Sequence, residues 1–159
     1  MRAALVALVV AAGVAASAIV DAQGRGGRGA AAGTVVGPGS VEHITVHGKA
    51  LEGNLEGDSP DRDVTVYLPP GYSSDQMRRY PVVYLLHGYG LTGERWVPFI
   101  NLPDAADKDA AEGMAKEMIL VSPDAFTKYS GSMYSSSPVT GDWEAFILAI
   151  YKSSLAKGA

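Results

Sequence analysis

The sequence contains no cysteine among its 159 residues. Disulfide bonds, cysteine-ligated zinc sites and thiol nucleophiles are therefore excluded. It also lacks an excess of basic residues, because 13 Lys and Arg stand against 17 Asp and Glu and give a net charge of -4. A folded nucleic-acid-binding domain usually carries a basic face. We therefore expect no nucleic-acid partner.

The composition is that of a globular protein. Hydrophobic residues make up 47% of the chain and charged residues 19%. Disordered proteins combine low hydrophobicity with high net charge, so this chain is not one of them. Its length allows one domain.

Residues 1–22 have the pattern of a secretory signal peptide. Arg2 supplies a positive charge, residues 3–20 are almost purely apolar, and small residues precede Gln23. The pattern predicts cleavage near Ala22 and a secreted or periplasmic protein. The alternative is a transmembrane anchor, but the run is rich in Ala and Gly, so we expect no stable membrane anchor.

Residues 23–39 form a low-complexity stretch of Gly, Ala and Arg. This composition predicts a flexible spacer between the signal peptide and a folded domain over residues 40–159. An RNA-binding Gly-Arg segment is the alternative, but two arginines are too few to hold a polyanion against salt.

Four segments have the patterns of β-strands. Residues 41–47 alternate between apolar and polar side chains, which predicts a half-buried strand, and residues 63–68 predict a second one. Residues 80–86 and 118–122 are nearly continuous apolar runs. Such runs are typical of strands buried on both faces of a parallel sheet.

Two segments have helical patterns. Residues 104–116, rich in Ala, Asp, Glu and Lys, predict a helix between the two buried strands, and this βαβ order predicts the α/β class. The last segment predicts the clearest helix, because its apolar residues form one stripe behind the N-cap candidate Asp142. The stripe consists of Trp143, Phe146, Ile147, Ile150 and Tyr151.

A glycine-rich loop at His87, Gly88, Tyr89 and Gly90 follows the third predicted strand. Dinucleotide binding is one interpretation, because residues 88–93 match G-x-G-x-x-G. The same pattern recurs in the spacer, and the acidic residue expected about 20 positions further on is missing. We therefore disfavour this interpretation and expect no cofactor.

The second interpretation of this loop is an oxyanion hole. A His-Gly turn after an apolar strand can direct backbone N–H groups at an oxygen that gains charge during acyl transfer. Glycine allows the main chain to approach the substrate carbonyl closely. A turn that merely ends the strand is the third interpretation.

The wider sequence resembles one family of enzymes. Residues 66–72 and 80–88 resemble the secreted esterases of the α/β-hydrolase superfamily, a group that includes esterase D and the feruloyl, acetylxylan and enterochelin esterases. Residues 121–125, 131–134 and 137–146 continue the resemblance in the same order. It implies a mostly parallel sheet with helices on both faces, and hydrolysis of small-molecule or carbohydrate-linked carboxylic esters by a Ser-His-Asp/Glu triad.

The resemblance also implies roles for particular residues. The oxyanion loop would be His87, Gly88, Tyr89 and Gly90, with the Tyr89 N–H as a donor. Residues bordering the acyl or leaving-group pocket would be Asp124, Tyr129 and Tyr134.

The nucleophile is the part that this resemblance does not supply. The sequence contains no G-x-S-x-G elbow, and in this family the triad would lie beyond Ala159. We therefore expect the N-terminal part of an esterase domain that is inactive alone; a non-catalytic secreted binding domain is the alternative.

Ser154, in an S-x-x-K pattern, is a disfavoured substitute for the missing nucleophile. His43 and His47 lie too far apart along their strand to share a metal, so we expect no metal site.

Overall fold

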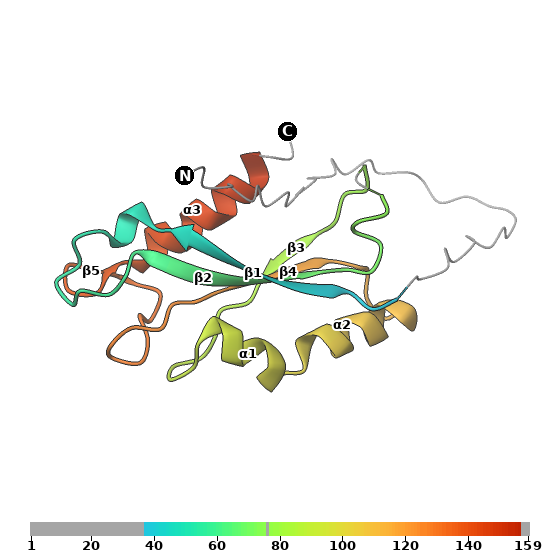
Figure 1. The fold of residues 1–159 in the computed structure, drawn as a ribbon, viewed down its shortest axis with the longest axis horizontal. Coiled ribbons are helices and arrows are strands. Elements are labelled where there is room, and N and C mark those ends of the chain that lie inside the picture. Colours follow the sequence, from blue (N-terminus) through green and yellow to red (C-terminus); the bar gives the residue numbers. More distant parts are fainter. Residues whose placement is uncertain (1–36, 76, 157–159) are drawn as a thin grey trace, which may run out of the picture.

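The protein is described by a computed structural model over residues 37–75 and 77–156, without the side chains of residues 153–156. The predicted signal peptide lies outside these residues. The centre of the fold is a four-stranded sheet in the order β1-β2-β4-β3 (Figure 1). The strands are β1 (Ser40–His47), β2 (Asp61–Leu68), β3 (Val82–Tyr84) and β4 (Ile119–Pro123).

The sheet is mixed in direction. β1 pairs with β2 in antiparallel register, β2 pairs with β4 in the same manner, and β3 pairs with β4 in parallel. Antiparallel neighbours such as β1 and β2 can be joined without a crossover, whereas parallel neighbours need one. The helices α1 (Gly93–Phe99) and α2 (Leu102–Ala111) form that crossover between β3 and β4, so the predicted βαβ unit is confirmed.

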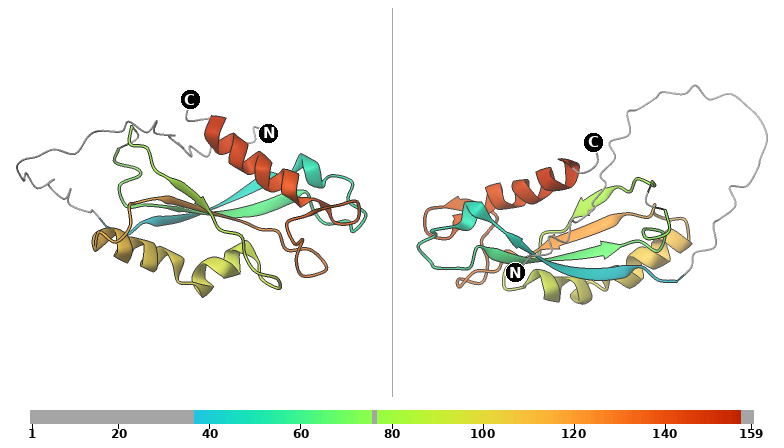
Figure 2. Two further views of the ribbon diagram at one scale, coloured as in Figure 1. Left: turned by 180° about the vertical axis from the view of Figure 1, so that it is seen from behind. Right: turned by 45° about the horizontal axis from the view of Figure 1, so that its top comes forward.

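Helices cover both faces of the sheet. In Figure 1, α1 and α2 lie below the sheet and α3 (Trp143–Ala156) lies above it, and the views in Figure 2 show the same layers. Near the start of α3 lie the short helix η1 (Lys49–Leu51) and a small ladder of β5 (Ser136–Ser137) and β6 (Gly141–Asp142). The predicted α/β class is confirmed.

The hydrophobic core lies mainly between α3 and the sheet. The Asp142 carboxylate accepts the N–H of Ala145 at 3.0 Å, which confirms the predicted N-cap. Behind that cap, the apolar stripe of α3 faces β2 and β4. The principal buried side chains are Leu51, Val64, Val66, Ile119, Val121, Trp143, Phe146 and Ile150.

The third strand differs from its prediction. β3 spans only Val82–Tyr84, and the Val83 side chain is 39% exposed. Among the described residues β3 pairs with β4 alone, so the expectation of burial on both faces over residues 80–86 is wrong. Hydrophobicity predicts that a strand exists, but the burial of each face depends on its neighbours.

The crossover helices also differ from their prediction. α2 runs over Leu102–Ala111 and ends earlier than expected, because Gly113 takes a left-handed φ of 70° just after the helix. The short helix α1 was not predicted at all. It begins at the N-cap Thr92, whose hydroxyl accepts the N–H of Arg95 at 3.2 Å, and Pro98 lies in its last turn.

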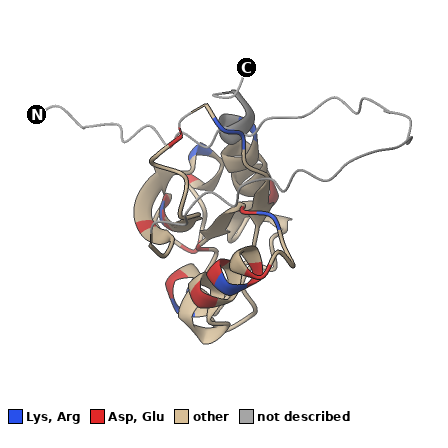
Figure 3. Cartoon of the chain, turned by 90° about the vertical axis from the view of Figure 1, so that its right-hand side faces the viewer, with Lys and Arg blue, Asp and Glu red and all other residues tan. Residues whose placement is uncertain are grey.

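The described surface carries charges of both signs. Lys and Arg positions are interspersed with Asp and Glu positions along the chain, as the coloured cartoon in Figure 3 shows from one side. Within residues 37–75 and 77–156, no helix is sufficiently long and apolar to cross a membrane.

Candidate active site

Two loops meet at one edge of the sheet. Residues 85–92 follow β3 and residues 124–134 follow β4, and the carboxyl ends of neighbouring parallel strands lie at the same edge. Between the two loops is a cavity of about 210 Å³. The residues that line it are His87, Gly88, Tyr89, Ala125, Gly131, Ser132, Met133 and Tyr134.

The side chain of His87 joins the two loops. It is buried, with 4% of its surface exposed, and its Nε2 accepts the N–H of Ala125 at 2.8 Å. Because that nitrogen is the acceptor, the hydrogen-bond network assigns the ring proton to Nδ1, which donates to the Gly88 carbonyl oxygen at 3.1 Å. Asp124 Oδ1 lies 3.7 Å from Nε2, a proximity without a hydrogen bond. This tautomer holds the loop together and leaves Nε2 occupied.

The peptide groups around Gly88 have fixed carbonyls and open N–H groups. The His87 carbonyl oxygen accepts the Tyr134 hydroxyl at 2.9 Å, and the Gly88 carbonyl oxygen also accepts the N–H of Leu91 at 3.2 Å. Within the described part of the chain, the N–H groups of Gly88 and Tyr89 meet no hydrogen-bond acceptor, whereas Gly90 donates to the Ser130 carbonyl oxygen at 2.8 Å. The loop thus has two adjacent backbone N–H groups without an acceptor among the described residues, and both belong to residues that line the cavity.

The second loop carries unusual backbone strain. Ser130, Met133 and Tyr134 have left-handed φ values of 69°, 56° and 52°. Such conformations are unfavourable for residues with a side chain, and they cluster at functional sites. Hydrogen bonds from the Ser130 N–H to the Thr127 carbonyl at 2.8 Å and from the Tyr134 N–H to Ser132 Oγ at 3.1 Å hold this conformation.

Tyr134 lies in the wall of the cavity. Its ring meets the His87 ring edge to face, with 5.8 Å between the centroids. Burial raises the pKa of the Tyr134 hydroxyl to about 12. The phenol therefore keeps its proton at physiological pH and acts as a hydrogen-bond donor.

Asp124 lies beside the cavity but is not among the residues that line it. Its carboxylate forms an ion pair with the buried guanidinium of Arg62, and its Oδ1 accepts the N–H of Gly93 at 3.2 Å. Arg62 in turn lies over the Trp143 ring, 5.1 Å from the centroid. Asp124 thus connects the start of α1, the strand β2 and the loop after β4.

Tyr89 and Tyr129 form the outer rim of the site. The Tyr89 hydroxyl donates to the Tyr129 carbonyl oxygen at 2.6 Å, and both side chains are mostly exposed. Tyr129 does not line the cavity itself. A Cβ at Gly131 would stand 3.0 Å from the Tyr89 ring, so the absence of a side chain there lets the two loops approach.

Two contacts of this site were not predicted from the sequence. The Ala125 N–H that holds His87 was not predicted because a backbone donor has no residue-type signature. Arg62 was not predicted because its partner Asp124 is 62 positions away, and an isolated charge in a strand does not indicate which residue it will meet.

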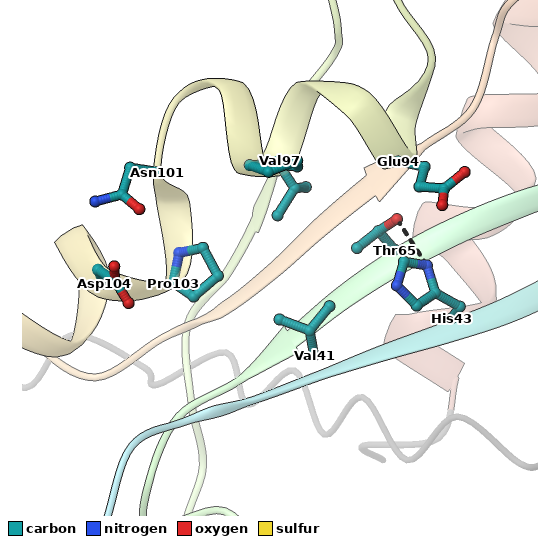
Figure 4. Close-up of a pocket in the computed structure, with 9 residues that line it drawn as sticks. Val41, His43, Thr65, Glu94, Val97, Asn101, Pro103 and Asp104 are labelled. Carbon is teal, nitrogen blue, oxygen red and sulfur yellow. Dashed lines mark hydrogen bonds between the residues drawn. The ribbon is translucent and has the colours of Figure 1, made fainter.

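A second, larger hollow of about 410 Å³ lies between the strands β1 and β2 and the helices α1 and α2 (Figure 4). His43 lines it, and its Nδ1 lies 3.3 Å from the Thr65 hydroxyl. His47 has other partners, Asp61 at 2.6 Å and Glu52 at 2.8 Å. Among the described residues no group of three or more His, Asp or Glu side chains has an arrangement that could hold a metal ion. The side chain of Ser154 lies outside the described residues.

Comparisons with known proteins point to one family. The Esterase family model, described as "Putative esterase", matches residues 59–148, which is more than half of the chain. A solved ferulic acid esterase is 28% identical, with a TM-score of 0.61, and the alignment covers 74% of this chain and 45% of that one. A ferulic acid esterase from Anaeromyces mucronatus, solved in complex with ferulic acid, is also 28% identical, with a TM-score of 0.47 and coverage of 72% and 40%. The chain spans less than half the length of these esterases.

Proposed function

This chain belongs to the esterase family of the α/β-hydrolase superfamily, and we propose that its part in carboxylic-ester hydrolysis is to bind the acyl oxygen through residues 87–90. The observation that carries this proposal is the pair of open N–H groups at Gly88 and Tyr89 beside the cavity. When a nucleophile attacks an ester carbonyl, the carbonyl oxygen gains negative charge. Two prepared N–H donors stabilise that charge, and each such donor is typically worth about 10²–10³ in rate.

Gly88 suits this role because it leaves the donors accessible. A Cβ built at Gly88 would meet no atom within 4 Å, so the space around it is open. A larger side chain at this position would enter that space without disturbing the fold. Glycine here is thus explained by access of a substrate rather than by packing.

The substrate class follows from the relatives and from the rim of the cavity. The relatives are ferulic acid esterases, whose substrates carry a planar aromatic acyl group. The cavity is bordered by Tyr89, Met133 and Tyr134, which offer apolar contacts to such a group. We propose a small aromatic ester, free or linked to carbohydrate, as the substrate.

The test of the loop uses ferulate, the product acid of the relatives, as a probe. Calorimetric titration of the full chain should give measurable binding, and Gly88→Val should weaken it by tenfold or more. Ala105→Val, which adds similar bulk on the exposed side of α2, is the matched control and should leave the affinity unchanged. Equal affinities for the native chain and a folded Gly88→Val variant would remove the loop from the proposal.

We also propose that the chain as given has no serine-esterase turnover of its own. Its 159 residues contain no G-x-S-x-G elbow, and His87 Nε2 is occupied by the Ala125 N–H rather than free to accept a proton. The purified chain should neither hydrolyse an activated acetyl ester nor react with a fluorophosphonate. Stoichiometric labelling of one serine, abolished by its change to Ala, would contradict this.

Export is the last part of the proposed function. The pattern of residues 1–22 supports export, because a charged start is followed by an apolar run and then by small residues. N-terminal sequencing of the exported protein should begin near Gln23. Protein that retains Met1 and stays in the cytoplasm would contradict the proposal.

A further inference from the structure

The direction of each open N–H group is set by the carbonyl of the same peptide. A peptide group is planar, so its C=O and N–H directions are tied together. The His87 carbonyl shares a peptide with the Gly88 N–H, and the Gly88 carbonyl shares one with the Tyr89 N–H. A hydrogen bond to either carbonyl therefore orients the neighbouring donor.

The two peptides are held in different ways. The Gly88 carbonyl oxygen has two nearby donors, His87 Nδ1 at 3.1 Å and the Leu91 N–H at 3.2 Å. Among the described residues, the His87 carbonyl oxygen has one donor, the Tyr134 hydroxyl at 2.9 Å, which comes from 47 positions along the chain. Glycine at position 88 leaves the adjoining backbone unusually free to rotate. The orientation of the His87–Gly88 peptide thus depends on one side chain, that of Tyr134.

Tyr134 is itself held firmly in place. Its backbone is in the left-handed region with a φ of 52°, next to Met133 with a φ of 56°. The turn directs the phenol at the His87 carbonyl. The edge-to-face contact with the His87 ring restricts the orientation of the Tyr134 ring. A strained backbone persists only where the surrounding structure holds it. Here the strained turn orients the Tyr134 hydroxyl toward the His87 carbonyl oxygen.

We infer that Tyr134 is a positioning residue, whose hydroxyl fixes the His87–Gly88 peptide and with it the direction of the Gly88 N–H. The inference deepens the proposed function and rests on it: the paired donors matter because they bind the acyl oxygen. The Tyr134 hydroxyl bonds to the loop peptide, at the His87 carbonyl oxygen. It acts by preparing the donors before the substrate arrives.

The first test measures the direction of the donors without any ligand. Residual dipolar couplings of the backbone N–H groups are recorded on the ¹⁵N-labelled full chain and on Tyr134→Phe. The Gly88 coupling should change and its signal should broaden by exchange, whereas Gly90, bonded to the Ser130 carbonyl, should stay the same. An unchanged Gly88 coupling in Tyr134→Phe overturns the inference.

Tyr67→Phe is the matched control for a purely structural effect. The Tyr67 hydroxyl donates to Asp107 Oδ1 at 2.7 Å, so this variant also loses a hydrogen bond of a buried tyrosine, but away from the loop. It should lower the melting temperature as Tyr134→Phe does. Its Gly88 coupling should equal that of the native chain, and a change of the same size would overturn the inference.

The second test measures the consequence for binding. Ferulate should bind Tyr134→Phe about threefold to tenfold more weakly than the native chain, the effect of one hydrogen bond, and Tyr67→Phe equally well. If Tyr134→Phe changes the Gly88 coupling but binds ferulate as tightly as the native chain, the positioning role is overturned. If ferulate shifts neither the Gly88 nor the Tyr89 signal of the native chain, the proposed function fails, whereas the couplings still decide the orientation by Tyr134.

A measurement on the unaltered chain covers the case in which Tyr134→Phe does not fold. In mixed H₂O and D₂O, a hydrogen bond from the Tyr134 hydroxyl should add a second isotope shift on the ¹³C signal of the His87 carbonyl, beyond the shift that the Gly88 amide of the same peptide causes. Absence of that second shift overturns the inference.

Discussion

The α3 side of the sheet and the loop edge at His87 are held together by different forces. On the α3 side, Trp143, Phe146 and Ile150 bury apolar surface against β2 and β4. At the loop edge, the principal contacts are hydrogen bonds between a side chain and the backbone: the Ala125 N–H donates to His87 Nε2, and the Tyr134 hydroxyl donates to the His87 carbonyl oxygen. Burial has no direction and stabilises in proportion to area, whereas a hydrogen bond to a carbonyl fixes the direction of a peptide.

The α3 side should therefore determine mainly the stability of the fold, and the loop edge mainly the orientation of the loop peptides. The α3 side should dominate the free energy of unfolding, because each large side chain there removes much apolar surface from water. The loop edge should contribute less to that free energy and more to binding.

The largest effect is expected at Phe146. Its side chain is 1% exposed and meets the Trp143 ring edge to face, with 5.8 Å between the centroids. Phe146→Ala should lower the free energy of unfolding by about 4 kcal/mol, through lost burial and a cavity. Urea denaturation measures it, and a loss below about 1 kcal/mol would mean that α3 is not the main source of stability.

The ion pair of Arg62 and Asp124 should give the next largest effect. Arg62→Met leaves the Asp124 carboxylate, whose side chain is 15% exposed, without its cation. The free energy of unfolding should fall by about 3 kcal/mol, since removing one partner strands a buried charge. The double variant Arg62→Met with Asp124→Leu should recover much of that loss, and a loss equal to the sum of the single variants would contradict the coupling.

Gly90 should show a smaller effect that comes from the backbone alone. It has a left-handed φ of 81°, and a Cβ there would meet no atom within 4 Å. Gly90→Ala should therefore cost about 1 kcal/mol of conformational strain without any clash. Gly88→Ala, where the added Cβ also meets open space, is the control and should cost less; equal costs would contradict the strain at Gly90.

The smallest effect is expected at His47, on the exposed side of β1. Hydrogen bonds to Glu52 and then Asp61 raise the pKa of His47 above its ordinary value of 6.5. A raised pKa in the folded state stabilises the fold fully below about pH 6.5, and the contribution disappears as pH rises through the raised value. His47→Gln should therefore lower the melting temperature slightly at about pH 5.5 and leave it unchanged at about pH 9; the opposite order would contradict the assignment.

The two regions also differ in how much of them the sequence predicts. The spacing of apolar residues predicts α3 and β1, because burial imposes a period on the sequence, and a continuous apolar run predicts β4. The residue type predicts the N-cap Asp142. The bond between Ala125 and His87 spans 38 positions and involves a backbone donor, so no periodicity encodes it. The resemblance predicts roles for residues 87–90 and Tyr134, but the left-handed turn at Met133 and Tyr134 has no glycine to mark it.

The most direct test of the account is a ferulate titration of the native full chain, followed by the ¹⁵N–¹H signals of the loop. Gly88 and Tyr89 have open N–H groups, whereas the Gly90 N–H already donates to the Ser130 carbonyl. The account predicts that the Gly88 and Tyr89 amide protons move downfield together along one binding curve while Gly90 moves little. Equal shifts at all three, or shifts confined to residues lining the larger hollow at His43, would contradict it.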